Sequence, residues 1–184
     1  MWKYLVAVII FSISRISTCA EAKLEAALPA KSLYNVSMQW TDDQERKVEL
    51  KKWQGRFVVI VMAYTSCGST CPVTIERLKK IAAAIDDRSD VSFVIVSFDS
   101  AQDSPKQLAK YKVQKQVPWD FLAGNEKEIR TLSLLLDIAY EKNPISGEIN
   151  HSNKIVLLDK QGMLAVTLDG LNADIEPLVD FIKK

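Results

Sequence analysis

The sequence is short of the side chains that build most metal centres, because its 184 residues include one histidine, His151, and three cysteines, Cys19, Cys67 and Cys71. An iron–sulfur cluster is usually held by four cysteines, and a structural zinc ion takes four protein ligands. The C-x-x-C-H motif that attaches haem is also absent. These shortages exclude an iron–sulfur cluster and attached haem, and they count against structural zinc. What remains is two closely spaced thiols and one imidazole.

The chain also lacks an excess of either charge. It has 24 lysines and arginines against 23 aspartates and glutamates, a formal net charge of +1. Nucleic-acid binding depends on clustered basic residues, and the pairs Lys51-Lys52 and Lys79-Lys80 are better interpreted as solvated surface. We therefore expect no nucleic-acid partner. The length and the absence of internal repeats predict a single folded domain.

The N-terminus has no apolar run that would span a bilayer comfortably. Residues 4–13 are apolar, but the run is short and is followed by Arg15. Lys3 precedes it, and residues 20–22 read Ala-Glu-Ala, a pattern typical of signal-peptide cleavage sites. Residues 1–22 are therefore predicted to be a signal peptide or an N-terminal anchor.

Cys19 leaves a lipid anchor open, although the threonine before it fits a lipoprotein motif poorly. Cleavage without lipid, lipid attachment and an uncleaved anchor all place the protein outside the cytoplasm, in the bacterial periplasm, either soluble or tethered to the membrane. Residues 23–32 are predicted to be a polar tether and residues 33–184 the folded domain. Disulfides persist outside the cytoplasm, so a purely structural bridge between Cys67 and Cys71 remains an alternative.

The rest of the sequence predicts strands that alternate with helices. Residues 57–63 are apolar on both faces, which is typical of a central parallel strand. Capping boxes predict two helix starts, at Ser104 and Asn125. The predicted strands are residues 34–40, 47–50, 57–63, 91–98, 154–159 and 163–168. The predicted helices are residues 72–85, 104–111, 125–136 and 175–183.

This order of elements predicts an α/β protein with a thioredoxin-like three-layer fold, an N-terminal β-hairpin extension and an inserted helix. In that topology the loop after the central strand and the loop before the closing hairpin lie at the same end of the sheet. We therefore expect His151 to lie near Cys67 and Cys71. This expectation comes from the fold topology and not from the spacing of the three residues.

Cys67 and Cys71 are four residues apart where the central strand gives way to a helix, and they lie on one face if the turn between them is helical. The positive end of the helix dipole favours thiolates, and thiolates prefer soft metals such as Cu(I). Two cysteines and one histidine suit Cu(I) better than structural zinc, and they can also hold Cu(II) with an added oxygen ligand. On the residues alone, a copper site, a metal-free redox couple and a structural disulfide all remain open.

The segment of residues 64–72, Tyr-Thr-Ser-Cys-Gly-Ser-Thr-Cys-Pro, resembles the Y-T-x-C-x-x-x-C-P signature of the Sco (SenC) family of copper-binding, cytochrome oxidase assembly proteins. Three further segments resemble that family in the same order, and together the matches span the chain from Tyr34 to Lys184. These segments are residues 50–58, residues 96–105, and the block that begins at His151-Ser152 and ends at Gly162.

The resemblance implies that copper, as Cu(I) or Cu(II), is bound by Cys67, Cys71 and His151. It also implies a metallochaperone that delivers copper to the binuclear copper site of cytochrome c oxidase. The implied partner is the copper-bearing subunit of the oxidase or another copper chaperone. Two alternatives are a thiol–disulfide oxidoreductase, with Cys67 and Cys71 as the redox-active pair, and a copper- or redox-sensing module.

Three positions depart from the family pattern: the spacer of residues 68–70, the segment of residues 99–102, and Asn150 before the histidine. The spacer of residues 68–70 lacks the Pro-Asp that is common in the family. The segment of residues 99–102 lacks the Asp-Pro and Arg that are common there, and Asn150 replaces an aspartate.

Four further residues are expected to have structural roles, with Asp99 and Asp103 in turns or caps and with Tyr64 and Trp119 in packing. Residues 141–150 are predicted to form an exposed, mobile loop that moves His151 onto and off the metal.

Overall fold

A computed structural model describes residues 27–68, 70–86 and 88–184. The predicted signal peptide or anchor, the lipid site at Cys19 and the first part of the predicted tether lie outside these residues. Within the described ranges, none of the helices has the length and apolar character needed to cross a bilayer.

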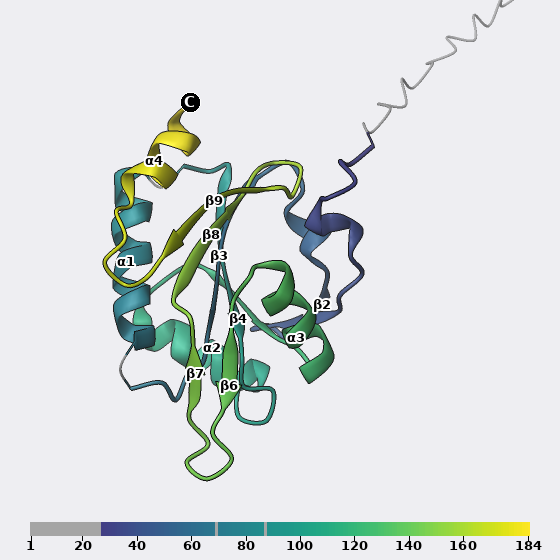
Figure 1. Ribbon diagram of the computed structural model, residues 1–184, viewed down its shortest axis with the longest axis vertical. Coiled ribbons are helices and arrows are strands. Elements are labelled where there is room, and N and C mark those ends of the chain that lie inside the picture. Colours follow the sequence, from purple (N-terminus) through teal and green to yellow (C-terminus); the bar gives the residue numbers. More distant parts are fainter. Residues whose placement is uncertain (1–26, 69, 87) are drawn as a thin grey trace, which may run out of the picture.

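Nine strands and four α-helices make up the described part of the chain (Figure 1). The strands are β1 (Trp40–Asp42), β2 (Lys47–Val48), β3 (Phe57–Ala63), β4 (Val91–Ser97), β5 (Asp120–Ala123), β6 (Tyr140–Lys142), β7 (Ile149–His151), β8 (Lys154–Leu158) and β9 (Leu164–Asp169). The helices are α1 (Thr70–Ala84), α2 (Pro105–Lys115), α3 (Glu126–Leu135) and α4 (Glu176–Lys183), with 3₁₀ turns η1 (Leu33–Asn35) and η2 (Leu50–Trp53).

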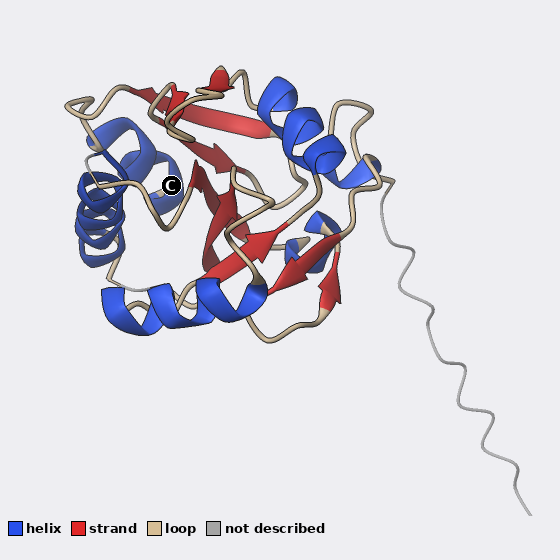
Figure 2. Cartoon of the chain, turned by 90° about the horizontal axis from the view of Figure 1, so that it is seen from below, coloured by secondary structure: helices blue, strands red, loops and turns tan. Residues whose placement is uncertain are grey.

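Seven strands form one sheet in the order β2-β1-β5-β4-β3-β8-β9, and β3 lies between a parallel and an antiparallel neighbour. The connections β3-α1-β4 and β4-α2-β5 step in the same direction, so right-handed crossovers place α1 and α2 on one face. Figure 2 shows these helices on one side of the sheet and α3 on the other. The prediction of a three-layer, thioredoxin-like α/β fold is confirmed.

The central strand and its helix follow the predicted pattern closely. All residues of β3 after Phe57 are buried, which explains why its sequence is apolar on both faces. The stripe of Ile75, Leu78 and Ala82 on the following helix is buried in the core, and so is Ile85 just after the helix. This packing fixes the end of β3 and the start of α1, where the two cysteines lie.

The prediction of a strand at residues 34–40 was wrong. Residues Leu33–Asn35 form a 3₁₀ turn, because the side chain of Ser32 accepts a hydrogen bond from the backbone N–H of Tyr34 and caps it. The strand begins at Trp40, which pairs with Val48 and so forms the predicted N-terminal hairpin. The hairpin exists, but it is shorter than its sequence suggests.

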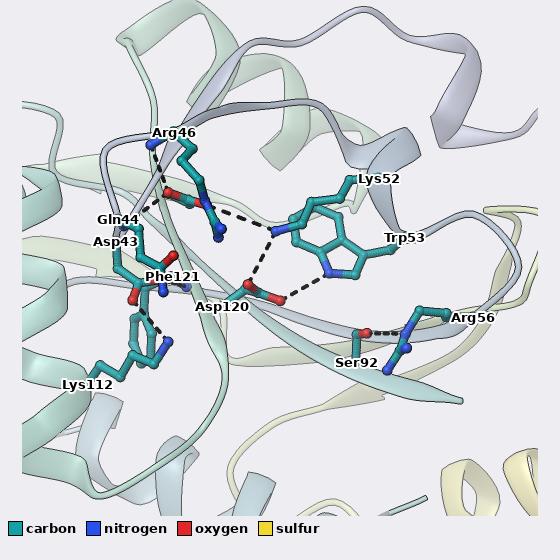
Figure 3. A network of polar contacts seen from close by, with 11 residues as sticks. Asp43, Gln44, Arg46, Lys52, Trp53, Arg56, Ser92, Lys112, Asp120 and Phe121 are labelled. Carbon is teal, nitrogen blue, oxygen red and sulfur yellow. Dashed lines mark hydrogen bonds and ion pairs between the residues drawn. The ribbon is translucent and has the colours of Figure 1, made fainter. Parts of the chain in front are cut away.

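Carboxylate contacts stabilise this hairpin and attach the segment that follows it to the sheet (Figure 3). Asp42 is fully buried, and its Oδ2 lies 2.7 Å from Nη2 of Arg46. Asp120 at the start of β5 accepts a hydrogen bond of 3.1 Å from the indole N–H of Trp53. The first contact lies within the hairpin, and the second joins η2 to β5, at the edge of the parallel strands.

Three short strands were missed, and two of them matter for the site. Strand β5 sits beside β4, with Phe121 and Leu122 fully buried. The expected loop at residues 141–150 is instead a hairpin in which β6 pairs with β7, and only its tip is a loop. The tip, residues 143–148, is exposed as predicted. His151 therefore lies on a strand and not in a free loop.

The first described residues contact the domain. Leu28 packs against the core, and the hydroxyl of Ser32 donates a hydrogen bond of 2.5 Å to the carbonyl of Gln161. The boundaries of the tether and of the domain stay predictions.

Candidate metal and thiol site

The two cysteines lie where the central strand β3 passes into helix α1. Cys67 is in the connecting loop and is 8% exposed, whereas Cys71 is in the first turn of the helix and is 1% exposed. The two sulfurs are not joined in a disulfide. The sequence therefore places both sulfurs at the positive end of a helix, at the edge of the sheet where β3 and β4 end.

The first turn of α1 points a backbone donor at one of the thiols. The N–H of Cys71 donates to Sγ of Cys67 over 3.3 Å, and Oγ1 of Thr70 lies 3.5 Å from the same sulfur. Hydrogen bonds from a helix N-terminus stabilise a negative sulfur. This part of the expectation about thiolates agrees with the geometry at Cys67.

Cys71 is different, because burial raises the pKa of its thiol to about 12, with a smaller contribution from its hydrogen bond to Cys67. The prediction that the helix start favours a thiolate is therefore wrong for Cys71 in the metal-free protein. The cost of removing charge from water outweighs the helix dipole at this depth. A bound cation or a change in burial would be needed to ionise it near neutral pH.

His151 reaches the cysteines from the end of β7. Its Nδ1 lies 3.0 Å from the carbonyl oxygen of Ser152, and since a carbonyl only accepts, we assign the ring proton to Nδ1. The other nitrogen, Nε2, then carries a lone pair and lies 3.9 Å from Sγ of Cys71. The expectation that His151 lies near the cysteines is confirmed for Cys71.

Aromatic rings form the wall around the imidazole. Phe98 lies with its centroid 4.8 Å from that of His151, and Tyr64 meets the same ring edge-on at 6.2 Å. The hydroxyl of Tyr64 accepts a hydrogen bond of 3.3 Å from the N–H of Ile149 on β7. Burial raises the pKa of Tyr64, so this phenol stays protonated. The predicted packing role of Tyr64 is confirmed.

Trp119 packs away from the site, in the core. Its ring stacks on Phe93 with centroids 5.0 Å apart, and it is 7% exposed. The prediction that it packs in the interior is confirmed.

Asp103 has a larger role than the predicted turn or cap. It is 1% exposed and accepts hydrogen bonds from the N–H of Thr65 (3.0 Å), the hydroxyl of Thr65 (2.5 Å) and the hydroxyl of Ser97 (2.5 Å). The capping residue of α2 is Ser104 instead. Asp103 therefore ties the loop before Cys67 to the end of β4. The sequence holds no local signal for this contact, because its partners lie on other elements.

One pair of donor atoms has the spacing that a shared metal ion requires, but the three donors do not form a closed site. Bonds of about 2.3 Å to sulfur and about 2.0 Å to nitrogen place two ligands of one ion roughly 3.5–4.3 Å apart. The 3.9 Å between Cys71 and His151 falls in that range. Among the described residues no group of three His, Cys, Asp or Glu side chains is already arranged as a metal site. Three ligands would therefore have to close together around an ion.

Comparison with known proteins identifies the family. A model of the SCO1/SenC family matches residues 27–184. The chain belongs to the SCO1/SenC family. The chain is 27% identical over 150 residues to the protein SCO1 homolog 1, mitochondrial, of Arabidopsis thaliana, and the match covers 77% of this chain but 44% of that protein. The chain thus spans less than half the length of this relative.

Two solved structures of the family share its fold. Arabidopsis thaliana ScoI with copper bound matches with a TM-score of 0.69 and 22% identity, covering 79% of this chain and 92% of that chain. BsSco, described as a member of the Sco family of cytochrome c oxidase assembly proteins in which a disulfide switch was identified, matches with a TM-score of 0.68 and 22% identity, covering 79% and 88%. At this level of identity the likeness supports the thioredoxin-like fold of our SCO1/SenC protein.

Proposed function

We propose that this protein binds one copper ion through Cys67, Cys71 and His151 and transfers it outside the cytoplasm to the binuclear copper site of cytochrome c oxidase. The acceptor is the copper-bearing subunit of the oxidase or another copper chaperone. Copper is the cargo of this reaction, and the protein acts as a metallochaperone.

The observation that carries the proposal is the meeting of His151 Nε2 and Cys71 Sγ at 3.9 Å. The two atoms come from distant elements, and the only histidine of the chain is one of them. The proton on Nδ1 leaves Nε2 ready to act as a ligand, as is usual for metal-binding histidines whose second nitrogen donates to a carbonyl. Copper bound to the related ScoI supports the choice of metal.

The surroundings of the thiols support exchange with an acceptor. A polar hollow of about 260 Å³ lies between the cysteine loop and the tip of the β6–β7 hairpin, with Ser66, Gly68 and Glu148 on its walls. Cys67 is the more exposed of the two thiols. An acceptor thiolate that enters here would contact the cargo from the side of Cys67, and the ion would pass between shared sulfur ligands.

An anaerobic Cu(I) competition titration tests the proposal. Cys19 is replaced by serine in every sample so that it does not compete, and the reduced protein is compared with His151→Ala and with the double variant Cys67→Ser/Cys71→Ser. We expect one tight equivalent, weaker binding without His151, and loss of tight binding without the thiols. Copper binding that is indifferent to His151 would contradict the three-ligand site.

A second function has its own support, namely reduction of the acceptor's cysteines. The N–H of Cys71 stabilises a negative Cys67 sulfur, whereas burial keeps Cys71 protonated, and this asymmetry suits an attacking and a resolving thiol. The Cys67 thiolate would attack the acceptor disulfide and release one thiolate. Cys71 would then lose its proton and attack Cys67, which releases the second acceptor thiolate and leaves a Cys67–Cys71 disulfide. Two electrons pass to the acceptor.

A peptide that carries the oxidised cysteine pair of a copper-site loop distinguishes the two functions. A reductase would reduce the peptide stoichiometrically with copper absent, and His151→Ala would leave the rate unchanged. A metallochaperone alone would reduce it no faster than the double variant Cys67→Ser/Cys71→Ser.

A further inference from the structure

His151 lies on a hairpin that is separate from the main sheet. Among the described strands, β6 and β7 pair with each other and not with the seven-stranded sheet, and Tyr140 is paired with His151. A two-stranded hairpin is only marginally stable by itself. The place of His151 relative to the cysteines therefore depends on the side chains that join this hairpin to the domain.

One ion pair joins the hairpin to the segment that follows β4. Nζ of Lys142, at the end of β6, lies 3.1 Å from Oδ1 of Asp99, and the carboxylate is 4% exposed whereas the lysine side chain is 46% exposed. Oδ1 of Asp99 also accepts a hydrogen bond of 3.3 Å from the N–H of Ala101. A carboxylate at this depth is costly without a cation, so the pair is harder to break than a surface contact.

From Asp99 the hydrogen bonds continue to the cysteine loop. The N–H of Asp99 donates to Oγ of Ser97 over 2.9 Å, and that hydroxyl donates to Asp103 over 2.5 Å. Asp103 in turn accepts from the N–H of Thr65, over 3.0 Å, in the loop that leads to Cys67. A continuous series of contacts thus connects the hairpin that carries the imidazole with the loop that carries the thiols.

Phe98 is the side chain on which the β6–β7 hairpin packs. Its ring lies 5.0 Å from Tyr140 and 4.8 Å from His151, so both strands of the hairpin rest on a single side chain. Asp99 is the next residue in the chain. The ion pair of Lys142 with Asp99 therefore attaches the hairpin next to Phe98, the ring on which the imidazole packs.

We propose that Lys142 and Asp99 are positioning residues for His151, because their ion pair holds the β6–β7 hairpin against Phe98 and keeps Nε2 within reach of the cysteines. The inference rests on the proposed copper site, since the position of Nε2 matters for affinity only if His151 is a ligand. Neither residue contacts the metal in this account. Asp99, expected from the sequence to be a turn residue, has this additional role.

The first test needs no metal. Amide hydrogen exchange of Ile149 reports whether the hairpin is docked, because its N–H donates to the hydroxyl of Tyr64 across the junction. Lys142→Met keeps the length and removes the charge, and we expect exchange about tenfold faster, because the docked state loses one of its few attachments. Lys142→Arg should retain the original rate. An unchanged rate in Lys142→Met would overturn the inference.

A matched control comes from α1. Lys79 pairs with the exposed Glu76 at 2.9 Å, and Lys79→Met removes a lysine ion pair that touches neither the hairpin nor the thiols. We expect it to leave the exchange of Ile149 and the copper affinity unchanged. A general effect of lost lysine charge would appear in both variants.

The second test is a double-variant cycle of Cu(I) affinity, with Cys19→Ser throughout. We expect Lys142→Met to weaken binding about tenfold, as loss of an outer partner of a metal ligand does. In the His151→Ala background the same change should have no effect, because there is no imidazole left to position. Equal weakening in both backgrounds would show that Lys142 acts through stability or charge, and would contradict the inference.

Failure of the proposed function is distinguishable from failure of this inference. If the parent protein binds no copper tightly, or if His151→Ala leaves affinity unchanged, the copper site is wrong, and the exchange rate of Ile149 still decides whether Lys142 docks the hairpin. If copper binding depends on His151 but Lys142→Met changes neither readout, the copper site stands and the positioning role is wrong.

Discussion

Nε2 of His151 lies 3.9 Å from Sγ of Cys71, although the two residues are 80 positions apart in the sequence. Two separate elements create this contact: the first turn of α1 carries the sulfur and the short strand β7 carries the imidazole. The fold therefore assembles a soft donor set from a sequence that has few such side chains to offer.

The two thiols should differ in reactivity. Iodoacetamide at pH 8 is expected to modify Cys67 at least about tenfold faster than Cys71, because the reagent needs a thiolate. Burial raises the pKa of Cys71 to about 12, and that residue is also the less exposed. Peptide-resolved mass spectrometry over time measures both rates in one sample.

The same experiment tests the sign of the pKa shift. Between pH 8 and pH 10 the rate at Cys71 should keep rising with pH, because its thiolate fraction is still small throughout that range. A rate at Cys71 that equals that of Cys67, or that levels off near pH 9, would show that the thiol is not held protonated by burial.

Gly124 should be intolerant of substitution. A Cβ at this position would lie 2.4 Å from Cζ3 of Trp40, and Trp40 is fully buried and has little room to move. We expect Gly124→Ala to lower the free energy of unfolding by about 1–3 kcal/mol, as overpacking does. Urea denaturation monitored by circular dichroism gives this value.

Gly68 is the matched control, since a Cβ there would meet nothing within 4 Å. Gly68→Ala should leave the free energy of unfolding within about 0.5 kcal/mol of the parent value. Equal stability of the two variants would mean that Trp40 yields to the added methyl group.

Ionisation of Asp90 should make the free energy of unfolding depend on pH in the acidic range. Hydrogen bonds from Arg88, and then from Lys160, hold the pKa of the Asp90 carboxyl well below its usual range. A depressed pKa means that the native state binds the proton less readily than the unfolded state. This contribution is therefore present above the unfolded pKa of about 4 and is lost as the pH falls below it.

Asp90→Asn should accordingly lower the free energy of unfolding by about 1 kcal/mol at pH 7. The value is modest because the carboxylate is partly exposed and screened by solvent. The difference between Asp90→Asn and the parent should shrink steadily between pH 5 and pH 2. Denaturation curves at several pH values measure it, and a difference that persists undiminished at pH 2 would contradict the assigned cause.

The elements that could be predicted from the sequence are those long enough to show a pattern of apolar residues. The seven apolar residues of β3 and the buried stripe of α1 are of this kind. Strands β5, β6 and β7 have three or four residues each, too few to show a period. The mostly exposed β6 owes its conformation to pairing with β7 and to Phe98, which are tertiary effects.

The site divides in the same way. The cysteines were identifiable from their spacing and from the strand and helix around them, and the fold topology and the family resemblance both pointed to His151. The contact of Lys142 with Asp99 joins residues 43 positions apart, and no local pattern marks either residue. The burial of Cys71, which reverses the effect expected from the helix start, likewise depends on the packed structure and not on the local sequence.

The most direct test of the central claim is X-ray absorption at the copper K-edge of the reduced protein loaded with one equivalent of Cu(I), with Cys19 replaced by serine. The account predicts a first shell of two sulfurs and one nitrogen, with imidazole scattering that disappears in His151→Ala. A shell of sulfur alone, or a spectrum unchanged by His151→Ala, would contradict a site built from Cys67, Cys71 and His151.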